Sequence, residues 1–417
     1  MMKQRDLLLK WVVYGLVLVY LLNCFSPLRL HVDMLRYFAI KDCIELGCPS
    51  DSFAAGDYLP YGYTILLLVL SKLSLLHSFV LVFINCIYLF GSLLLIRKIF
   101  GNQINFFLLG VLVLLNWTII KFVTHPLSEM QFLFFSMASL YFFRRYSDTR
   151  RLLSLILSFA MCALAFLTRS AGLALAAALV AGLLWLYREQ LLLLMRRNKI
   201  LVVALVLVLA CIVVFSRLLG LDHYTSVFTK QFREGLQFST MLKWHFTEWS
   251  EIAGNTSIVK IFPFVPASVA KTLFFGIGVL LVAGFLWLLF ARAKGTPMVV
   301  KLYLLFYTVL MFDWPFYDPR FWVPVLPLIA AVIAGLPFPK RKLYRAAVTG
   351  WFAVYLVLGV VSAAYMTYTS LNRRVMARTH ANGVYRNEYE TVFFGKPQSD
   401  TARRIDPEVL SVIRRYN

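Results

Sequence analysis

The sequence predicts an all-α membrane protein with about eleven transmembrane helices and a juxtamembrane or re-entrant helix after the first span. Sixty per cent of its 417 residues are hydrophobic and 15% are charged, whereas a soluble domain is apolar in about half of its residues or fewer. Apolar segments recur along the chain, and short basic clusters separate them. This composition and this pattern exclude an ordinary soluble domain.

Most of the expected spans approach the ~17 to 25 residues that a membrane helix needs. The stretch from Tyr63 to Leu76 is apolar for about 14 residues and contains Lys72, so we expect a re-entrant or interfacial helix there. In chain order, the eleven expected spans are 7–25, 78–96, 104–120, 127–143, 152–168, 171–187, 200–216, 269–291, 299–312, 321–337 and 346–366.

Basic residues between the spans determine the expected orientation. If residues 63–76 do not cross, the basic clusters face the cytoplasm, as the excess of Lys and Arg in short cytoplasmic loops requires. The first span follows Lys3, Arg5 and Lys10 and lacks a small-residue cleavage site, so we interpret it as a retained signal anchor with a cytoplasmic N-terminus. The basic clusters that set the orientation therefore account for the formal charge of +22, and no nucleic-acid partner is expected.

These spans divide the chain into a transmembrane domain, residues 1–366, and a short extracytoplasmic tail, residues 367–417. Within the domain, a first outer loop covers 26–77 and a long outer loop covers 217–268. The tail has few apolar positions, and a short helix is expected to begin after Asp406. We expect a multi-pass protein of a bacterial inner membrane whose polar chemistry faces the extracytoplasmic side.

The first outer loop is acidic and ends in Tyr-Leu-Pro-Tyr-Gly-Tyr from Tyr58. A bundle that lies in lipid carries few carboxylates, so a cluster at one face marks a place where polar ligands or chemistry are handled. Cys43 and Cys48 share this loop, and the spacing leaves a disulfide and two free thiols equally open. The ionisable side chains of the loop include His31, Asp33, Asp42, Glu45, Asp51 and Asp57.

Several short motifs follow one another in a characteristic order. After His-Val-Asp from His31 and the Tyr58 motif come a basic turn ending at Gly101, His-Pro-Leu-Ser-Glu from His125, Phe-Leu-Thr-Arg-Ser-Ala-Gly from Phe166, and Asp-Pro-Arg-Phe-Trp-Val-Pro from Asp318. Over roughly residues 7–340, this order resembles the C-type (GT-C) membrane glycosyltransferases, which include protein O-mannosyltransferases and lipid A aminoarabinose transferases. Met34 follows Asp33 where the O-mannosyltransferases carry an Asp-Glu pair, and the C-terminal part is shorter than in the aminoarabinose transferases. The resemblance therefore does not identify the acceptor.

The resemblance assigns Asp33 and Glu129 to catalysis. A carboxylate at Asp33 would take the proton that an acceptor hydroxyl loses as it attacks the sugar; the alternative is a solvated acid that caps a juxtamembrane helix. Glu129 would place the acceptor or a metal, or merely interact with the positive end of a helix.

Cations at the outer turns are expected to hold the phosphate of a lipid-linked donor. Arg169 and Arg320 suit this role because a guanidinium binds phosphate through two parallel hydrogen bonds. The alternatives are contact with lipid headgroups for Arg169 and a salt bridge to Asp313 or Asp318 for Arg320. Lys72 is a weaker phosphate candidate.

Other residues are assigned to substrate or metal contacts. Asp57 and Tyr61 would contact the sugar, although Asp57 equally suits the solvated turn before Pro60. His31 and His125 would join Asp33 or Glu129 around a divalent ion, or remain amphipathic surface residues without one. In the long outer loop, sugar stacking or interface anchoring is expected for Tyr224, Phe232, Trp244, His245 and Trp249.

Together these features predict transfer of a sugar from a polyprenyl-phosphate donor to a glycolipid, glycan or protein acceptor, with inversion. Since the sequence contains no Gly-rich phosphate loop, a nucleotide sugar is not expected, and no cofactor is required beyond a possible divalent metal. Two alternatives remain: a flippase or transporter, whose binding groups would lie near the bilayer midplane, and a polymerase or ligase that acts on lipid-linked saccharides.

Overall fold

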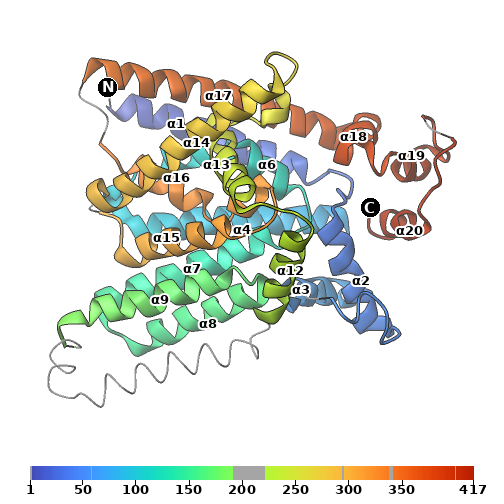
Figure 1. Ribbon diagram of the computed structural model, residues 1–417, viewed down its shortest axis with the longest axis horizontal. Coiled ribbons are helices and arrows are strands. Elements are labelled where there is room, and N and C mark those ends of the chain that lie inside the picture. Colours follow the sequence, from blue (N-terminus) through green and yellow to red (C-terminus); the bar gives the residue numbers. More distant parts are fainter. Residues whose placement is uncertain (1, 58, 191–220, 294, 338–340, 400) are drawn as a thin grey trace.

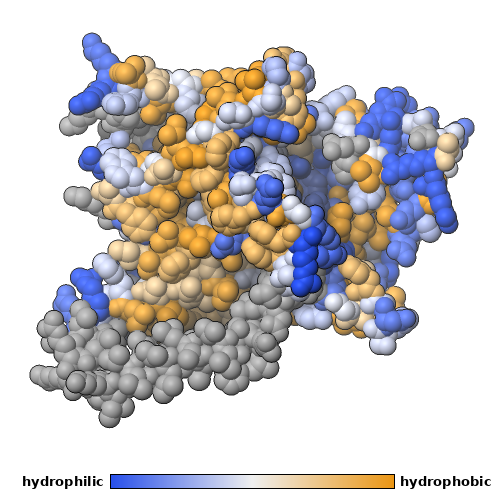
Figure 2. Space-filling view, in the orientation of Figure 1, coloured by the Kyte–Doolittle hydropathy of each residue, from blue (hydrophilic) through white to orange (hydrophobic). Residues whose placement is uncertain are grey.

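The structure is a computed structural model that describes residues 2–57, 59–190, 221–293, 295–337, 341–399 and 401–417 (Figure 1). Throughout these residues the regular elements are helices, and no strand occurs among them. Apolar side chains cover much of the surface of the helical bundle, whereas hydrophilic side chains gather over the C-terminal helices at one end (Figure 2). The expected all-helical architecture is therefore present.

One layer of the bundle consists of five neighbouring helices, in which α4 packs on α7, α7 on α8, α8 on α9, and α9 on α15. Small polar residues allow close approach, as is common between membrane helices. Ser139 and Ser158 each donate a hydrogen bond to the other's carbonyl, both at 2.9 Å, and so join α7 to α8. The bounds are α4 (Ser78–Phe100), α7 (Glu129–Thr149), α8 (Leu152–Thr168), α9 (Gly172–Leu186) and α15 (Met298–Phe312).

Fewer helices in the described part of the chain qualify as membrane spans than the eleven that the sequence predicts. Among the described residues, three helical stretches are long and apolar enough to cross a membrane, namely Ser78–Gln103, Ala267–Arg292 and Lys342–Leu371. A bent pair of helices makes a possible fourth, and further apolar helices, such as α1 (Met2–Asn23), have shorter apolar parts. The expected span 200–216 lies outside the described residues.

The expected span over 104–120 is not one continuous helix. The chain forms α5 (Phe106–Leu114) and α6 (Trp117–Val123), which meet at a bend of 70°. Asn116 explains the break, because its side chain accepts a hydrogen bond from the backbone N–H of Thr118 at 3.1 Å and thereby caps a new helix.

The expected helix over 321–337 is also interrupted. A 3-10 turn (Pro319–Trp322) precedes the short α16 (Leu326–Ala334). Proline lacks a backbone N–H and clashes with the preceding turn of a helix, so Pro324 and Pro327 confine the α-helix to the second half of this segment.

The expected long loop over 217–268 is mostly helical where it is described. It contains α12 (Leu221–Arg233) and α13 (Phe238–Gly254), and α13 packs along α14 (Ala267–Trp287). Gly278 makes this approach possible, because a Cβ at that position would lie 1.8 Å from the carbonyl oxygen of Phe246.

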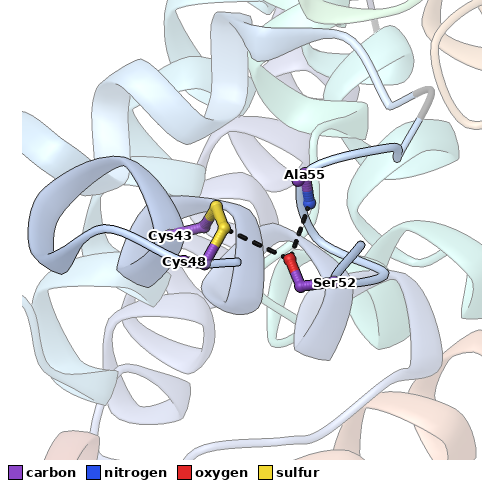
Figure 3. Close-up of a disulfide and its surroundings, with 4 residues drawn as sticks. All are labelled: Cys43, Cys48, Ser52 and Ala55. Carbon is purple, nitrogen blue, oxygen red and sulfur yellow. Dashed lines mark hydrogen bonds between the residues drawn. A yellow bond between two sulfur atoms is a disulfide. The ribbon is translucent and has the colours of Figure 1, made fainter. Parts of the chain in front are cut away.

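The first outer loop contains α2 (Val32–Leu46) and α3 (Tyr61–Lys72), and the second of these matches the expected short helix. Cys43 and Cys48 form a disulfide at the end of α2, where the Ser52 hydroxyl donates a hydrogen bond to the Cys48 sulfur at 3.2 Å (Figure 3).

The C-terminal tail folds back onto the segment that leads into α2. It comprises the end of α17 (Lys342–Leu371), then α18 (Arg373–Thr379), α19 (Arg386–Phe394) and α20 (Pro407–Tyr416). Tyr389 donates to the carbonyl of Leu28 at 2.5 Å and accepts from the N–H of Leu30 at 3.0 Å. As expected, α20 begins after Asp406, whose side chain caps it.

Candidate active site

The N-terminus of α2 presents Asp33. His31 occupies the cap position, and its side chain accepts a hydrogen bond from the N–H of Asp33 at 3.2 Å. Asp33 therefore lies in the first turn, where the positive end of the helix favours a carboxylate. Its side chain is 24% exposed, so a small polar molecule can reach it.

Two arginines contact the Asp33 carboxylate. Arg320 Nη2 lies 2.7 Å from Oδ2, and Arg36 Nη1 lies 3.3 Å from Oδ1. Burial disfavours the charged form of Asp33, but Arg320, His31 and Arg169 outweigh that effect, so the pKa of Asp33 lies below its ordinary value. The carboxylate is consequently ionised at neutral pH and able to accept a proton.

Glu129 begins α7 and contacts Arg320 and a further arginine, Arg169. Its Oε1 lies 2.6 Å from Arg169 Nη1 and 3.5 Å from Arg320 Nε. The side chain is 1% exposed, and its Oε2 has no hydrogen-bond partner among the described residues. This oxygen remains available for a polar group of a ligand.

Arg169 follows the last turn of α8. Burial alone would lower the pKa of Arg169, but Glu129 and other neighbours raise it above its ordinary value, so the guanidinium stays charged. Where the chain is described, its hydrogen bonds all come from Nη1, to Glu129 and to the Ser128 hydroxyl at 3.2 Å. Its Nε and Nη2 therefore have no hydrogen-bond partner among the described residues and remain able to bind an anion.

Arg320 lies in the 3-10 turn before α16 and connects three carboxylates. Besides Asp33 and Glu129, it contacts Asp318, whose Oδ2 lies 3.1 Å from Arg320 Nε. The salt bridge to Asp318 that the sequence suggested as an alternative thus exists together with the contact to Asp33. Arg320 Nη1 also lies 3.2 Å from His31 Nδ1.

The other expected substrate contacts divide into two groups. Asp57 lies next to the cluster, because Arg36 donates to its two carboxylate oxygens at 2.8 and 2.6 Å while also reaching Asp33. Lys72 is 72% exposed and lies 3.6 Å from Glu45, outside the cluster. Tyr61 is 50% exposed, and among the described residues no hydrogen bond or ion pair joins it to the cluster.

A pocket of about 390 Å³ adjoins the cluster and has Arg169 in its wall. The rest of its lining is mainly apolar and comes from the turn between α8 and α9, from α12, from α15 and from the segment after α15. The apolar lining includes Ala171, Phe228, Leu310, Met311, Trp314 and Phe321. The arrangement therefore places the Arg169 guanidinium in the wall of a mainly apolar cavity, which Asp313 also lines.

Sequence reasoning missed the residues that hold Arg320 in place. Glu248 on α13 is fully buried and accepts hydrogen bonds from the N–H of Asp318 and the indole N–H of Trp322, both at 2.7 Å. His245 bridges Glu248 and the carbonyl of Trp314, at 2.8 and 2.7 Å. The i, i+3 spacing of 245, 248 and 251 on one helix was the available signal.

The expected role of the aromatic residues changes accordingly. His245 and Trp249 are buried and belong to the packing beneath the site, so sugar stacking is wrong for these two. Trp244 and Phe232 are half-buried, whereas the side chain of Tyr224 lies outside the described part of the chain.

The described residues do not form a metal centre. No group of three or more His, Cys, Asp or Glu side chains converges among them. His31 contacts Arg320, whereas His125 donates to the carbonyl of Lys121 through Nδ1 at 2.8 Å. A guanidinium beside His31 repels a cation, so these residues do not fit the divalent ion that the sequence left open.

The fold and the site define a helical membrane-type protein that carries a buried cluster of carboxylates and arginines. Comparison of the chain with family models, curated proteins and solved structures finds no match.

Proposed function

We propose that this protein is a membrane glycosyltransferase that moves a sugar from a polyprenyl-phosphate donor to a hydroxyl of an extracytoplasmic acceptor. The observation that carries this proposal is the position of Asp33, an ionised and partly exposed carboxylate beside a mainly apolar pocket that Arg169 lines. A base and a phosphate-binding cation next to an apolar cavity are the parts that such a transfer needs.

In the proposed step, an acceptor oxygen attacks the anomeric carbon while Asp33 takes its proton. The bond between that carbon and the phosphate oxygen breaks, and the polyprenyl phosphate leaves with the electron pair. A single displacement of this kind inverts the anomeric configuration, and no covalent enzyme intermediate forms.

Arg169 would neutralise the leaving phosphate. Its Nε and Nη2, which have no hydrogen-bond partner among the described residues, provide two parallel donors, the geometry that guanidinium uses with phosphate. The apolar lining of the adjoining pocket suits the first isoprene units of the lipid. The buried Oε2 of Glu129 would accept a hydrogen bond from the acceptor.

The proposal includes the finer topology: eleven crossings, a cytoplasmic N-terminus and a site that faces the periplasm of a bacterial inner membrane. The distribution of basic clusters between the apolar segments supports it. Lipid-linked sugars are the donors available on that side.

The test uses the full chain in lipid nanodiscs with a panel of polyprenyl-phosphate sugars and a membrane-lipid or glycan extract as acceptor. Release of free polyprenyl phosphate is measured for wild type, Asp33→Asn and Arg169→Ala. Asp51→Asn is the matched control, because Asp51 is an exposed acid of the same loop. The proposal expects turnover in wild type and in the control and its loss in both site variants.

A different pattern would overturn the proposal. If no donor is turned over while lipid-linked sugar binds wild type and both site variants equally, the assigned base and phosphate site are wrong, and transport becomes the leading function.

A further inference from the structure

Arg29 is a buried cation that contacts no carboxylate in the described part of the chain. It is 5% exposed, and its Nε and Nη2 donate only to neutral oxygens, among them the hydroxyls of Ser26, Thr369 and Ser370, each at 3.0 Å. Its Nη1 has no partner among the described residues. Burial lowers the pKa of Arg29 to about 10, so the group is still charged at neutral pH.

Lys121 on α6 is a second cation that forms no ion pair with a described residue. Burial lowers its pKa, and the more distant carboxylates of Asp318 and Glu251 offset only part of that effect. Its ammonium group lies over the rings of Trp117 and Phe122, at 5.8 and 4.9 Å from their centres, and makes no hydrogen bond or ion pair with a described residue. In contrast, each arginine of the Asp33 cluster contacts at least one carboxylate. A desolvated charge is costly unless an opposite charge accompanies it.

Two stacked histidines connect these cations. The rings of His125 and His380 lie 5.6 Å apart in a stacked arrangement. His125 Nδ1 donates to the carbonyl of Lys121, and His380 Nε2 donates to the carbonyl of Leu30, next to Arg29, at 2.7 Å. Each ring therefore has its other nitrogen without a partner among the described residues.

The two histidines also report the local excess of positive charge. Burial and the nearby Arg29 lower the pKa of His380 to about 3. Burial, His380, Arg29 and Lys121 likewise hold the pKa of His125 well below its ordinary value. Both rings are neutral in the unliganded protein, and both become potential donors when an anion offsets the charge.

We propose that Arg29, Lys121, His125 and His380 form a second anion site, separate from the Arg169 pocket, which binds a phosphate group. The phosphate belongs either to a soluble or substrate molecule or to an anionic lipid headgroup. These four residues come from the first outer loop, from α6 and the turn after it, and from the tail. A chain of contacts brings the three segments together: His380 binds the carbonyl of Leu30 and stacks on His125, and His125 binds the carbonyl of Lys121.

Inorganic phosphate is the first probe, titrated against chloride at constant ionic strength into the full chain in phosphatidylcholine nanodiscs. The midpoint of thermal unfolding rises in wild type, and Lys121→Met weakens the apparent affinity about tenfold to a hundredfold, the factor for one charge-assisted hydrogen bond. Lys121→Arg retains binding. Lys243→Met, which removes an exposed lysine of α13, is the matched control and also retains it.

Two further experiments distinguish this site from the Arg169 pocket and a lipid headgroup from a soluble phosphate. Repeating the titration in Arg169→Gln shows whether the Lys121-dependent shift persists without the other pocket, as the proposal expects. Replacing part of the phosphatidylcholine with phosphatidylglycerol stabilises wild type but not Lys121→Met if a headgroup occupies the site, and has no Lys121-dependent effect if the ligand is soluble.

The proposal is overturned if wild type and Lys121→Met respond equally to phosphate and to phosphatidylglycerol. Should the methionine variant fail to fold, Lys121→Gln provides the same comparison. No turnover is measured, so the outcome is independent of whether the protein transfers sugars.

Discussion

Glu248 positions Arg320 without touching it. Its carboxylate accepts hydrogen bonds from the backbone of Asp318 and from the indole of Trp322, the residues two positions before and after Arg320. Because Glu248 binds the residues on both sides of Arg320, the turn that carries Arg320 is held at each end. Arg320 in turn reaches Asp33, which is 287 positions earlier in the chain.

We predict that Glu248→Gln destabilises the protein by about 1–3 kcal/mol, the cost of leaving a buried partner group unsatisfied. The amide retains one acceptor oxygen but cannot serve as the anionic partner of His245. Urea titration in nanodiscs measures the change. Glu234→Gln, at an exposed position directly after α12, is the control and should change stability by less than about 0.5 kcal/mol.

Arg320→Gln is expected to shift the acid limb of the transfer reaction. Asp33 must be ionised to act as a base, and in wild type its pKa is lowered, so activity persists below the ordinary Asp value of about 3.9. Without Arg320, the strongest of the interactions that lower the pKa of Asp33 is lost, so this pKa rises. The pH profile of kcat/KM should therefore begin to fall at a higher pH in the variant; an unchanged acid limb would contradict the role of Asp33 as base.

Deletion of residues 407–417 should loosen α2. Lys41, whose side chain is completely buried, lies 2.8 Å from Glu45 and 3.0 Å from the hydroxyl of Tyr416 in α20. Amide hydrogen exchange in residues 32–46 should accelerate about tenfold or more, since a lost hydrogen bond to a charged group costs about 1.5–3 kcal/mol. Exchange in α8 of the same variant serves as the internal reference. Arg414→Ala, which changes an exposed residue of α20, is the control variant and should leave exchange in residues 32–46 unchanged.

Asn116→Ala should destabilise the bend between α5 and α6. The substitution removes the cap of α6 and the hydrogen bond from Asn116 to the Tyr355 hydroxyl at 3.0 Å. We expect a loss of about 1–2 kcal/mol, measured by urea titration. Asn102→Ala, at an exposed position, provides the comparison, and equal stability of the two variants would count against the capping role.

The helical class, the short helix at 61–72 and the start of α20 after Asp406 were predictable from the sequence. Hydropathy, charge spacing and helix caps act over a few residues, so they can be recognised locally. For the same reason, Asp33, Glu129, Arg169 and Arg320 could be selected as unusual charges in an apolar chain. Whether these residues act in catalysis remains a prediction.

Only the tertiary structure decided which candidates lie together. Arg320 meets Asp33 and Glu129, whereas Lys72 lies on the surface beside Glu45. The break at Asn116 and the support from Glu248 also depend on partners that are distant in the sequence. Hydropathy specifies that a segment is buried, but it does not specify which buried polar groups satisfy one another; the packing of the helices determines those pairs.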